Sequence, residues 1–98
     1  MPDVLDPEGA HLAALHRLHD FTGERVIEVG CRDGRLTLGI AEHAASVLAF
    51  DPDDPAIARA GAALPPALAG RVTYRVASAT DIEITPSSWD VVVFSWTL

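Results

Sequence analysis

The most constraining feature of the sequence is an apolar segment that runs into a turn marked by two glycines. The apolar segment is Arg25–Val29, the turn holds Gly30 and Gly34, and a second apolar run at 47–50 ends on Asp51. Glycine accepts positive φ and lets a ligand approach the backbone, and a helix after the turn offers unpaired N–H groups. A carboxylate at the tip of the second strand can accept hydrogen bonds from both hydroxyls of a ribose. The pattern therefore predicts a nucleotide-binding βαβ unit.

The glycine spacing distinguishes between classes of nucleotide cofactor. A dinucleotide site of the G-x-G-x-x-G type would need glycine where the chain has Arg32 and Arg35, which disfavours a nicotinamide-dependent oxidoreductase. The glycines fit acidic-x-G-x-G-x-G with only the middle glycine replaced, as Glu28-Val29-Gly30-Cys31-Arg32-Asp33-Gly34. This segment resembles motif I of the class I S-adenosylmethionine-dependent methyltransferases.

Three later segments resemble the same family, in the same order. Residues 49–53 (Ala-Phe-Asp-Pro-Asp) are similar to the second motif, whose acidic residue holds the ribose. Residues 72–82 are similar to the third strand and the adenine-contacting turn, and residues 87–95, with their Asp-Val-Val-Val run, to the fourth strand. The order and the intervals make the combination much more specific than any one segment.

The resemblance implies a site for S-adenosylmethionine. Asp51 is expected to hold the ribose, Phe50 and Pro52 to flank the adenine, and Ser78 to stand where the family has an aspartate facing the adenine amino group. Phe94 is expected near the transferred methyl group. The predicted cofactor-contacting residues are Glu28, Gly30, Cys31, Gly34, Asp51, Pro52, Ser78, Ala79 and Phe94.

Several of these residues have a structural alternative. Glu28 could contact the methionine end of the cofactor or only brace the glycine turn. Asp51 could instead cap the next helix, a role that Asp53 or Asp54 could also fill. Cys31 is expected to be a small residue that fits the turn, since no base is visibly placed beside it to make it a nucleophile. No catalytic residue is identified, and no metal site is predicted.

Short apolar strands alternate with helical segments along the chain. We expect strands at 25–29, 46–50, 72–76 and 89–94, helices at 35–42 and 55–63, and a preceding N-terminal helix at 5–21. The alternation predicts a parallel sheet with right-handed crossovers. The resemblance implies an α/β, Rossmann-like three-layer α/β/α fold with strand order 3-2-1-4. Because the family fold continues beyond a fourth strand, residues 1–98 are expected to form a single partial domain.

The composition restricts the compartment and the partners. The chain has 98 residues, enough for one small domain. Its net charge of −7 disfavours a nucleic-acid surface, which needs a basic stripe, and suits a cationic sulfonium ligand. The single cysteine excludes an internal disulfide. With no apolar run of ~20 residues and no signal peptide, the sequence predicts a cytoplasmic protein.

The leading functional prediction is methyl transfer from S-adenosylmethionine to an unidentified small-molecule acceptor. The alternative is a non-catalytic S-adenosylmethionine-binding remnant or an interaction module. The 98-residue chain alone is expected to have little turnover, because the family builds most of its acceptor pocket after the fourth strand. Val91, Val93 and Trp96 are expected to leave an apolar open sheet edge through which the chain dimerises or aggregates.

Overall fold

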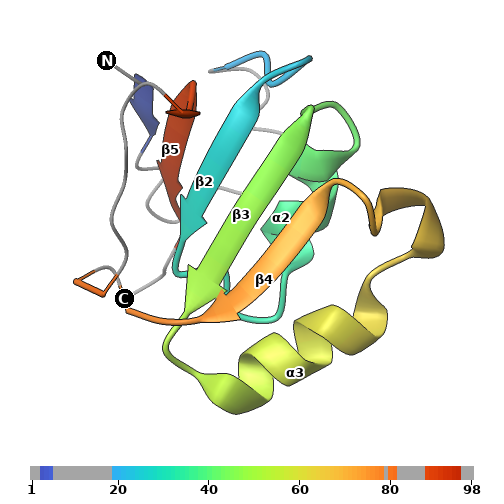
Figure 1. Cartoon of the computed structure of the whole chain (residues 1–98), viewed down its shortest axis with the longest axis vertical. Helices are drawn as coiled ribbons and strands as arrows, with labels where there is room; N and C mark the ends of the chain where they lie inside the picture. The colour runs from blue at the N-terminus through green and yellow to red at the C-terminus, as the bar shows by residue number, and fades with distance from the viewer. Residues whose placement is uncertain (1–2, 6–18, 79, 82–87, 96–98) are drawn as a thin grey trace.

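The computed structural model describes residues 3–5, 19–78, 80–81 and 88–95. They form one five-stranded sheet in the order β1-β5-β2-β3-β4, with every neighbouring pair parallel (Figure 1). The strands are β1 (Asp3–Leu5), β2 (Arg25–Val29), β3 (Ser46–Asp51), β4 (Val72–Val76) and β5 (Val91–Phe94). The four predicted strands are β2, β3, β4 and β5, and their observed order confirms the predicted order 3-2-1-4.

The first strand, β1, was not predicted, and it changes one edge of the sheet. Asp3 pairs with Val91 and Leu5 with Val93, so β5 lies between β1 and β2. Val91 and Val93 are both 0% exposed. The prediction of an open apolar edge at these two residues is therefore wrong, because β1 covers the edge. Trp96, the third residue of that predicted edge, lies outside the described residues.

The predicted N-terminal helix at 5–21 falls mostly on residues 6–18, which lie outside the described part of the chain. Its two ends are described. Leu5 is the last residue of β1, and residues 19–21 are not helical. The helix itself stays a prediction.

Two helices pack on one face of the sheet. They are α2 (Arg35–Ala41) and α3 (Asp54–Ala63), and a short 3-10 turn, η1 (Pro66–Leu68), leads from α3 toward β4. Asp53 caps α3, because its carboxylate accepts the Ala56 N–H at 3.2 Å. It is one of the three aspartates that the sequence offered for this role, with Asp51 and Asp54. Apolar residues of both helices share one core cluster with inward-facing strand residues; its members include Ile40, Ile57, Val26, Val47 and Val91.

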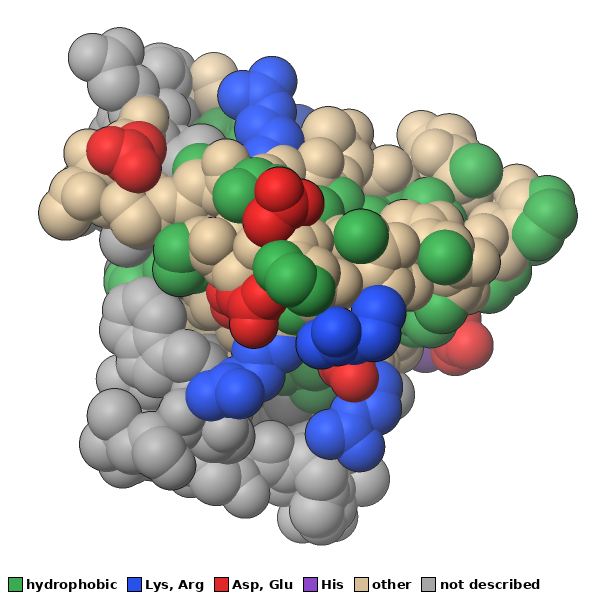
Figure 2. All heavy atoms as spheres, turned by 90° about the horizontal axis from the view of Figure 1, so that it is seen from below, with side chains coloured by type: hydrophobic (Ala, Val, Ile, Leu, Met, Phe, Trp, Pro, Cys, Tyr) green, Lys and Arg blue, Asp and Glu red, His purple; other side chains and the backbone are tan. Residues whose placement is uncertain are grey.

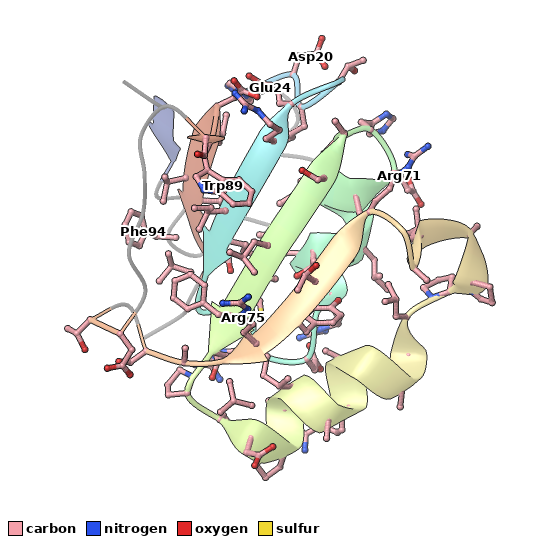
Figure 3. The ribbon with its side chains drawn as sticks, in the orientation of Figure 1. Asp20, Glu24, Arg71, Arg75, Trp89 and Phe94 are labelled. Atoms are coloured by element: carbon pink, nitrogen blue, oxygen red, sulfur yellow. The ribbon has the colours of Figure 1, made fainter. Side chains whose placement is uncertain are left out.

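A second apolar cluster lies on the other face of the sheet. Its buried members are Ile27, Val29, Phe50 and Val92. Trp89, which precedes β5, and Phe94, the last residue of β5, are labelled in Figure 3; both are half-buried and pack against this cluster. Because successive residues of a strand point to opposite faces, each central strand supplies both clusters, which explains its nearly continuous apolar sequence.

All the strands are parallel, so their carboxyl ends meet at one edge of the sheet. This edge holds Val29, Asp51, Val76 and Phe94, the last residues of β2, β3, β4 and β5. β3, which follows β2 in the chain, lies on one side of β2 and β5 lies on the other, and such a switch point is where open parallel sheets bind ligands. Among the described helices, none is both long and apolar enough to cross a membrane.

Candidate functional site

The turn between β2 and α2 has the backbone conformation that its glycines predict. Gly30 and Gly34 have φ values of 79° and 86°, and Arg32 between them has φ 52°. The N–H groups of Gly30 and Cys31 both donate to the carbonyl of Phe50, at 2.9 and 3.1 Å, and thereby tie the turn to the end of β3. A non-glycine residue in the left-handed region carries strain, so Arg32 occupies a position that suits glycine better.

Gly34 is fixed by its surroundings as well as by its φ. A Cβ at this position would overlap the hydroxyl oxygen of Tyr74 and would lie 3.2 Å from the Cβ of Ala60. The Tyr74 hydroxyl is buried without a hydrogen-bond partner in the described structure, and burial raises the pKa of Tyr74 to about 12. Tyr74 of β4 and Ala60 of α3 therefore leave no room for a side chain at Gly34, where α2 begins.

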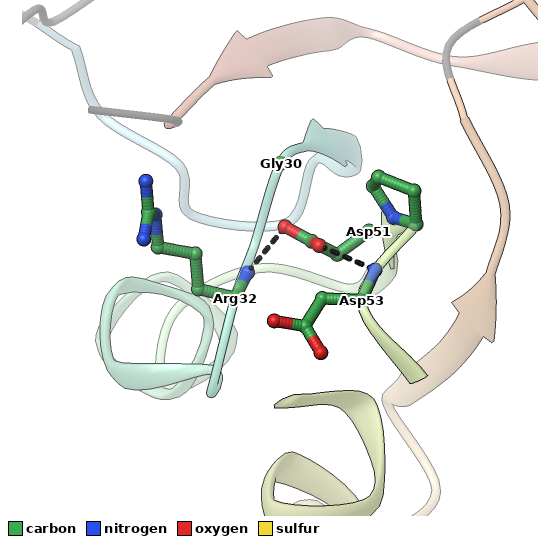
Figure 4. Close-up of a pocket in the computed structure, with 5 residues that line it drawn as sticks. Gly30, Arg32, Asp51 and Asp53 are labelled. Atoms are coloured by element: carbon green, nitrogen blue, oxygen red, sulfur yellow. Dashed lines mark hydrogen bonds between the residues drawn. The ribbon is translucent and has the colours of Figure 1, made fainter. Parts of the chain in front are cut away.

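Asp51 joins the glycine turn to the segment that leads into α3. Its Oδ2 accepts the Arg32 N–H at 3.0 Å, and its Oδ1 accepts the Asp53 N–H at 2.9 Å (Figure 4). Asp53, not Asp51, caps α3. Because each carboxylate oxygen has room for a second hydrogen bond, Asp51 can still accept two donors from a ligand.

A cavity of about 300 Å³ opens beside this carboxylate. It is lined by Gly30, Arg32, Asp51, Pro52 and Asp53 (Figure 4). Three of these residues were predicted to contact the cofactor; Arg32 and Asp53 were not. Both stand inside the motif segments 28–34 and 49–53, and both carry the N–H groups that Asp51 accepts, which is the signal that could have found them.

A smaller cavity of about 180 Å³ adjoins the first and shares Arg32 and Asp53 with it. Its remaining lining is Asp33, Arg35, Ala56 and Arg59. Viewed toward the carboxyl edge of the sheet, Figure 2 shows basic side chains gathered beside acidic ones. Asp33 and Arg35 form an exposed ion pair at 3.7 Å, which is a contact of the kind that contributes little to stability.

Glu28 is placed beneath the turn and not in the cavity. It is 0% exposed; Thr37 donates a hydrogen bond to its Oε1, and Ser95 donates to its Oε2 at 2.6 Å. Burial raises the pKa of Glu28, and the two hydroxyl hydrogen bonds oppose that rise. The structure therefore shows the bracing arrangement for Glu28, with both carboxylate oxygens bonded to protein.

Cys31 is a structural residue of the turn. It is 5% exposed, and burial, with the nearby Glu28 and Asp51 carboxylates, raises the pKa of its thiol far above the usual range. A thiol that stays protonated is a poor nucleophile. This agrees with the expectation that Cys31 only fits the turn.

The adenine side of the predicted site is described in part. Phe50 is 1% exposed, so the expectation that it flanks the adenine is wrong: its side chain is buried in the apolar cluster with Ile27, Val29 and Val92. The Ser78 hydroxyl donates to Asp81 at 2.8 Å, so Asp81 caps this turn. Ala79 lies outside the described residues. Val76, which sequence reasoning missed, is 49% exposed and lies opposite Asp51 in the ladder.

Phe94 is brought to the same edge as the glycine turn. It pairs with Val29 in the β2–β5 ladder and is half-buried. Ser95 follows it, and its N–H donates to the Val29 carbonyl at 2.9 Å. Within the part of the chain that the structure describes, no group of three or more His, Cys, Asp or Glu side chains could hold a metal ion.

The family described as methyltransferase domain matches residues 26–98. The chain therefore belongs to the methyltransferase domain family, and the resemblance seen in the motifs is confirmed. The chain is 39% identical over 62 residues to a magnesium-protoporphyrin O-methyltransferase of Rhodobacter capsulatus, an alignment that covers 63% of this chain and 28% of that protein.

Solved structures show the same fold. An S-adenosylmethionine dependent methyltransferase from Mesorhizobium loti is 30% identical, with a TM-score of 0.71, over 85% of this chain and 36% of that one. Phosphoethanolamine N-methyltransferase 1 of Haemonchus contortus was solved with phosphoethanolamine and S-adenosylhomocysteine. It is 28% identical, with a TM-score of 0.75, over 85% of this chain and 17% of that one. The chain spans well under half the length of each of these relatives.

Proposed function

We propose that the carboxyl edge of this sheet binds S-adenosylmethionine, and that the protein transfers its methyl group to a small-molecule acceptor. Membership of the family supports the reaction class. The named relatives, one of them an O-methyltransferase and one solved with S-adenosylhomocysteine, support the cofactor.

The observation that carries the proposal is the position of Asp51. Its carboxylate lines the 300 Å³ cavity, and each oxygen already accepts one backbone N–H, which fixes its orientation. The remaining acceptor sites suit the two hydroxyls of a ribose. Because Asp53 caps α3, the helix does not need Asp51 for that purpose.

The other predicted residues have places around the same ligand. Gly30 would let the cofactor lie against the backbone, and Pro52 with the exposed Val76 would offer apolar surface to the adenine. Ser78 would stand at the adenine edge, Phe94 near the sulfur, and Cys31 and Gly34 would shape the turn. S-adenosylmethionine, when bound, supplies an electrophilic methyl group. The residues of this chain would hold and orient the cofactor, and in-line methyl transfer depends chiefly on such alignment.

Three predictions from the sequence stay predictions. They are the cytoplasmic location, the pairing of two copies of the chain, and the low turnover of these 98 residues alone. The alternative function, binding without catalysis, uses the same cofactor site. A turnover assay, and not a binding assay, separates it from the leading proposal.

The test is a calorimetric titration with S-adenosylmethionine, S-adenosylhomocysteine and NAD. We expect the two sulfur compounds to bind and NAD not to bind. Asp51→Ala should weaken binding by about 1.5–3 kcal/mol, the cost of losing hydrogen bonds to a charged group, which is roughly tenfold to hundredfold. Asp54→Ala, an exposed residue in the first turn of α3, is the matched control and should leave affinity unchanged.

Two results would contradict the proposal. One is binding of NAD without binding of either sulfur compound. The other is unchanged affinity in an Asp51→Ala variant whose circular dichroism matches that of the wild type, which would leave Asp51 a purely structural residue.

A further inference from the structure

A buried network of three side chains ties together the elements that meet at the glycine turn. Glu28 belongs to β2, Thr37 to α2, and Ser95 follows β5. Glu28 and Thr37 are both 0% exposed. The Thr37 hydroxyl donates to Oε1 of Glu28, and the Ser95 hydroxyl donates to Oε2 at 2.6 Å.

The network holds both ends of the turn. Glu28 precedes Gly30, and Thr37 follows Gly34. The hydrogen bond between Glu28 and Thr37 therefore closes the base of the loop that holds the two glycines. Ser95 adds a contact from β5, since its Oγ also lies 3.2 Å from the Gly30 carbonyl oxygen. A buried carboxylate is costly unless it is hydrogen-bonded, and here it is bonded on both oxygens. The turn therefore has little freedom to change its shape while the network is intact.

We infer that Glu28, Thr37 and Ser95 are positioning residues, which set the geometry of the glycine turn and through it the ribose carboxylate, without touching the cofactor. The inference rests on the function proposed above. Glu28 does not line the 300 Å³ cavity and has no exposed surface, so a ligand ammonium group does not reach it in this structure. The link to the ligand is Arg32, whose N–H in the turn donates to Oδ2 of Asp51 at 3.0 Å.

Two ligands separate positioning from direct contact. S-adenosylhomocysteine has the amino-acid part of the cofactor, whereas 5′-methylthioadenosine keeps the adenosine and sulfur but lacks that part. If Glu28 acts through the turn, Glu28→Gln leaves the ratio of the two affinities unchanged. If Glu28 contacts the ammonium group, the variant loses affinity for S-adenosylhomocysteine alone, and the inference is overturned.

Thr37 offers a matched pair of variants at a single buried position. Thr37→Val keeps the shape of the side chain and removes the hydroxyl, whereas Thr37→Ser keeps the hydroxyl. We expect Thr37→Val to weaken both ligands by the same factor, roughly tenfold, and Thr37→Ser to bind as the wild type does. Equal affinities for the two variants would overturn the inference, because a residue with a purely packing role would not distinguish them.

A measurement without ligand keeps this inference separate from the proposed function. The N–H groups of Gly30, Cys31, Arg32 and Gly34 are all hydrogen-bonded in the turn. In Thr37→Val their hydrogen exchange should be faster than in Thr37→Ser, while the N–H of Val47, bonded to the Arg71 carbonyl, should be unchanged. Equal exchange at the turn would overturn the inference. A wild-type protein that binds neither ligand would refute the proposed function instead, and the exchange result would still decide whether the network sets the turn.

Discussion

The strands β2 and β5 are joined at both ends by polar side chains, but the two joints differ in their surroundings. At the amino end, Arg25 donates to Asp90 from its backbone N–H at 2.8 Å and from its guanidinium at 3.3 Å. Their side chains are 48% and 38% exposed. At the carboxyl end, the Glu28–Ser95 pair joins the same strands, and Glu28 has no exposed surface.

The difference shows how burial changes the meaning of a similar contact. An exposed ion pair gains little, since water and salt screen it and water replaces a lost partner. A buried carboxylate has no such replacement, so removing one partner leaves an unsatisfied charged group. The amino end therefore tolerates change, and the carboxyl end, where the candidate site lies, does not.

The largest expected effect comes from replacing a glycine that has positive φ, and two such glycines are compared: Gly23, which precedes β2, and Gly34, at the end of the turn that follows β2. Gly34→Ala should lower the free energy of unfolding by about 2–5 kcal/mol, because left-handed strain adds to the overlap with Tyr74 and Ala60. Gly23 has φ 71° and nothing within 4 Å of the place a Cβ would take, so Gly23→Ala should cost only about 1–2 kcal/mol. Urea unfolding of both variants measures the difference; equal losses would show that the carboxyl end is no more restrictive.

A smaller effect is expected when one partner is removed from each joint. Ser95→Ala should destabilise the fold by about 1–3 kcal/mol, because one oxygen of the buried Glu28 loses its hydrogen bond. Asp90→Ala should destabilise it less, since water can reach Arg25. Thermal unfolding at neutral pH compares the two variants. A larger loss for Asp90→Ala would reverse the comparison.

The smallest effect concerns how the free energy of unfolding depends on pH: the contributions of Glu28 and Asp90 should change with pH in opposite directions. Burial raises the folded pKa of Glu28 above 4.5, so the unfolded chain releases this proton first and wild-type stability falls as pH rises through the folded pKa. The stability of Glu28→Gln relative to that of the wild type should then rise with pH, by at most ~1.4 kcal/mol per pH unit. The nearby Cys31 and Tyr74 stay protonated in acid and at neutral pH, because burial raises the pKa of both side chains.

Asp90 should show the opposite trend. Its hydrogen bonds from Arg25 lower its pKa below 3.8, so the contribution of Asp90 is present above that value and is lost as pH falls through the folded pKa. The advantage of the wild type over Asp90→Asn should therefore disappear in acid. Unfolding curves of the wild type and both variants across the acid range test the two signs together, and parallel curves would contradict them.

The sequence predicted the central βαβ units because their signals are local. The strands at 25–29 and 72–76 have the predicted bounds, and α2 and α3 begin within one residue of the predicted positions. Apolar runs and turn residues decide these elements. The three-residue β1 has no such pattern, and it exists through pairing with β5, a partner far along the chain. Its presence is why the predicted edge was wrong.

The sequence could predict those residues of the candidate site whose place is set by the order of strands and turns along the chain. Gly30, Gly34 and Asp51 follow from the order of strand, turn and strand, and the structure brings them to one edge. The partners of Glu28 were not predictable, because Thr37 and Ser95 meet it only when α2 packs on the sheet and β5 pairs with β2. Phe50 was misjudged for a related reason: its face of the strand depends on register.

The pairing of β1 with β5 has a consequence for the order in which the fold can assemble. α2 lies between β2 and β3 in the chain, and α3 with η1 lies between β3 and β4, so the β2–β3 and β3–β4 ladders close short loops. The ladder between β1 and β5 joins segments that are almost the whole described chain apart, and closing so long a loop costs more entropy. Of the described strands, the earliest to leave the ribosome is thus among the last to find its neighbour, and contacts of this kind slow folding.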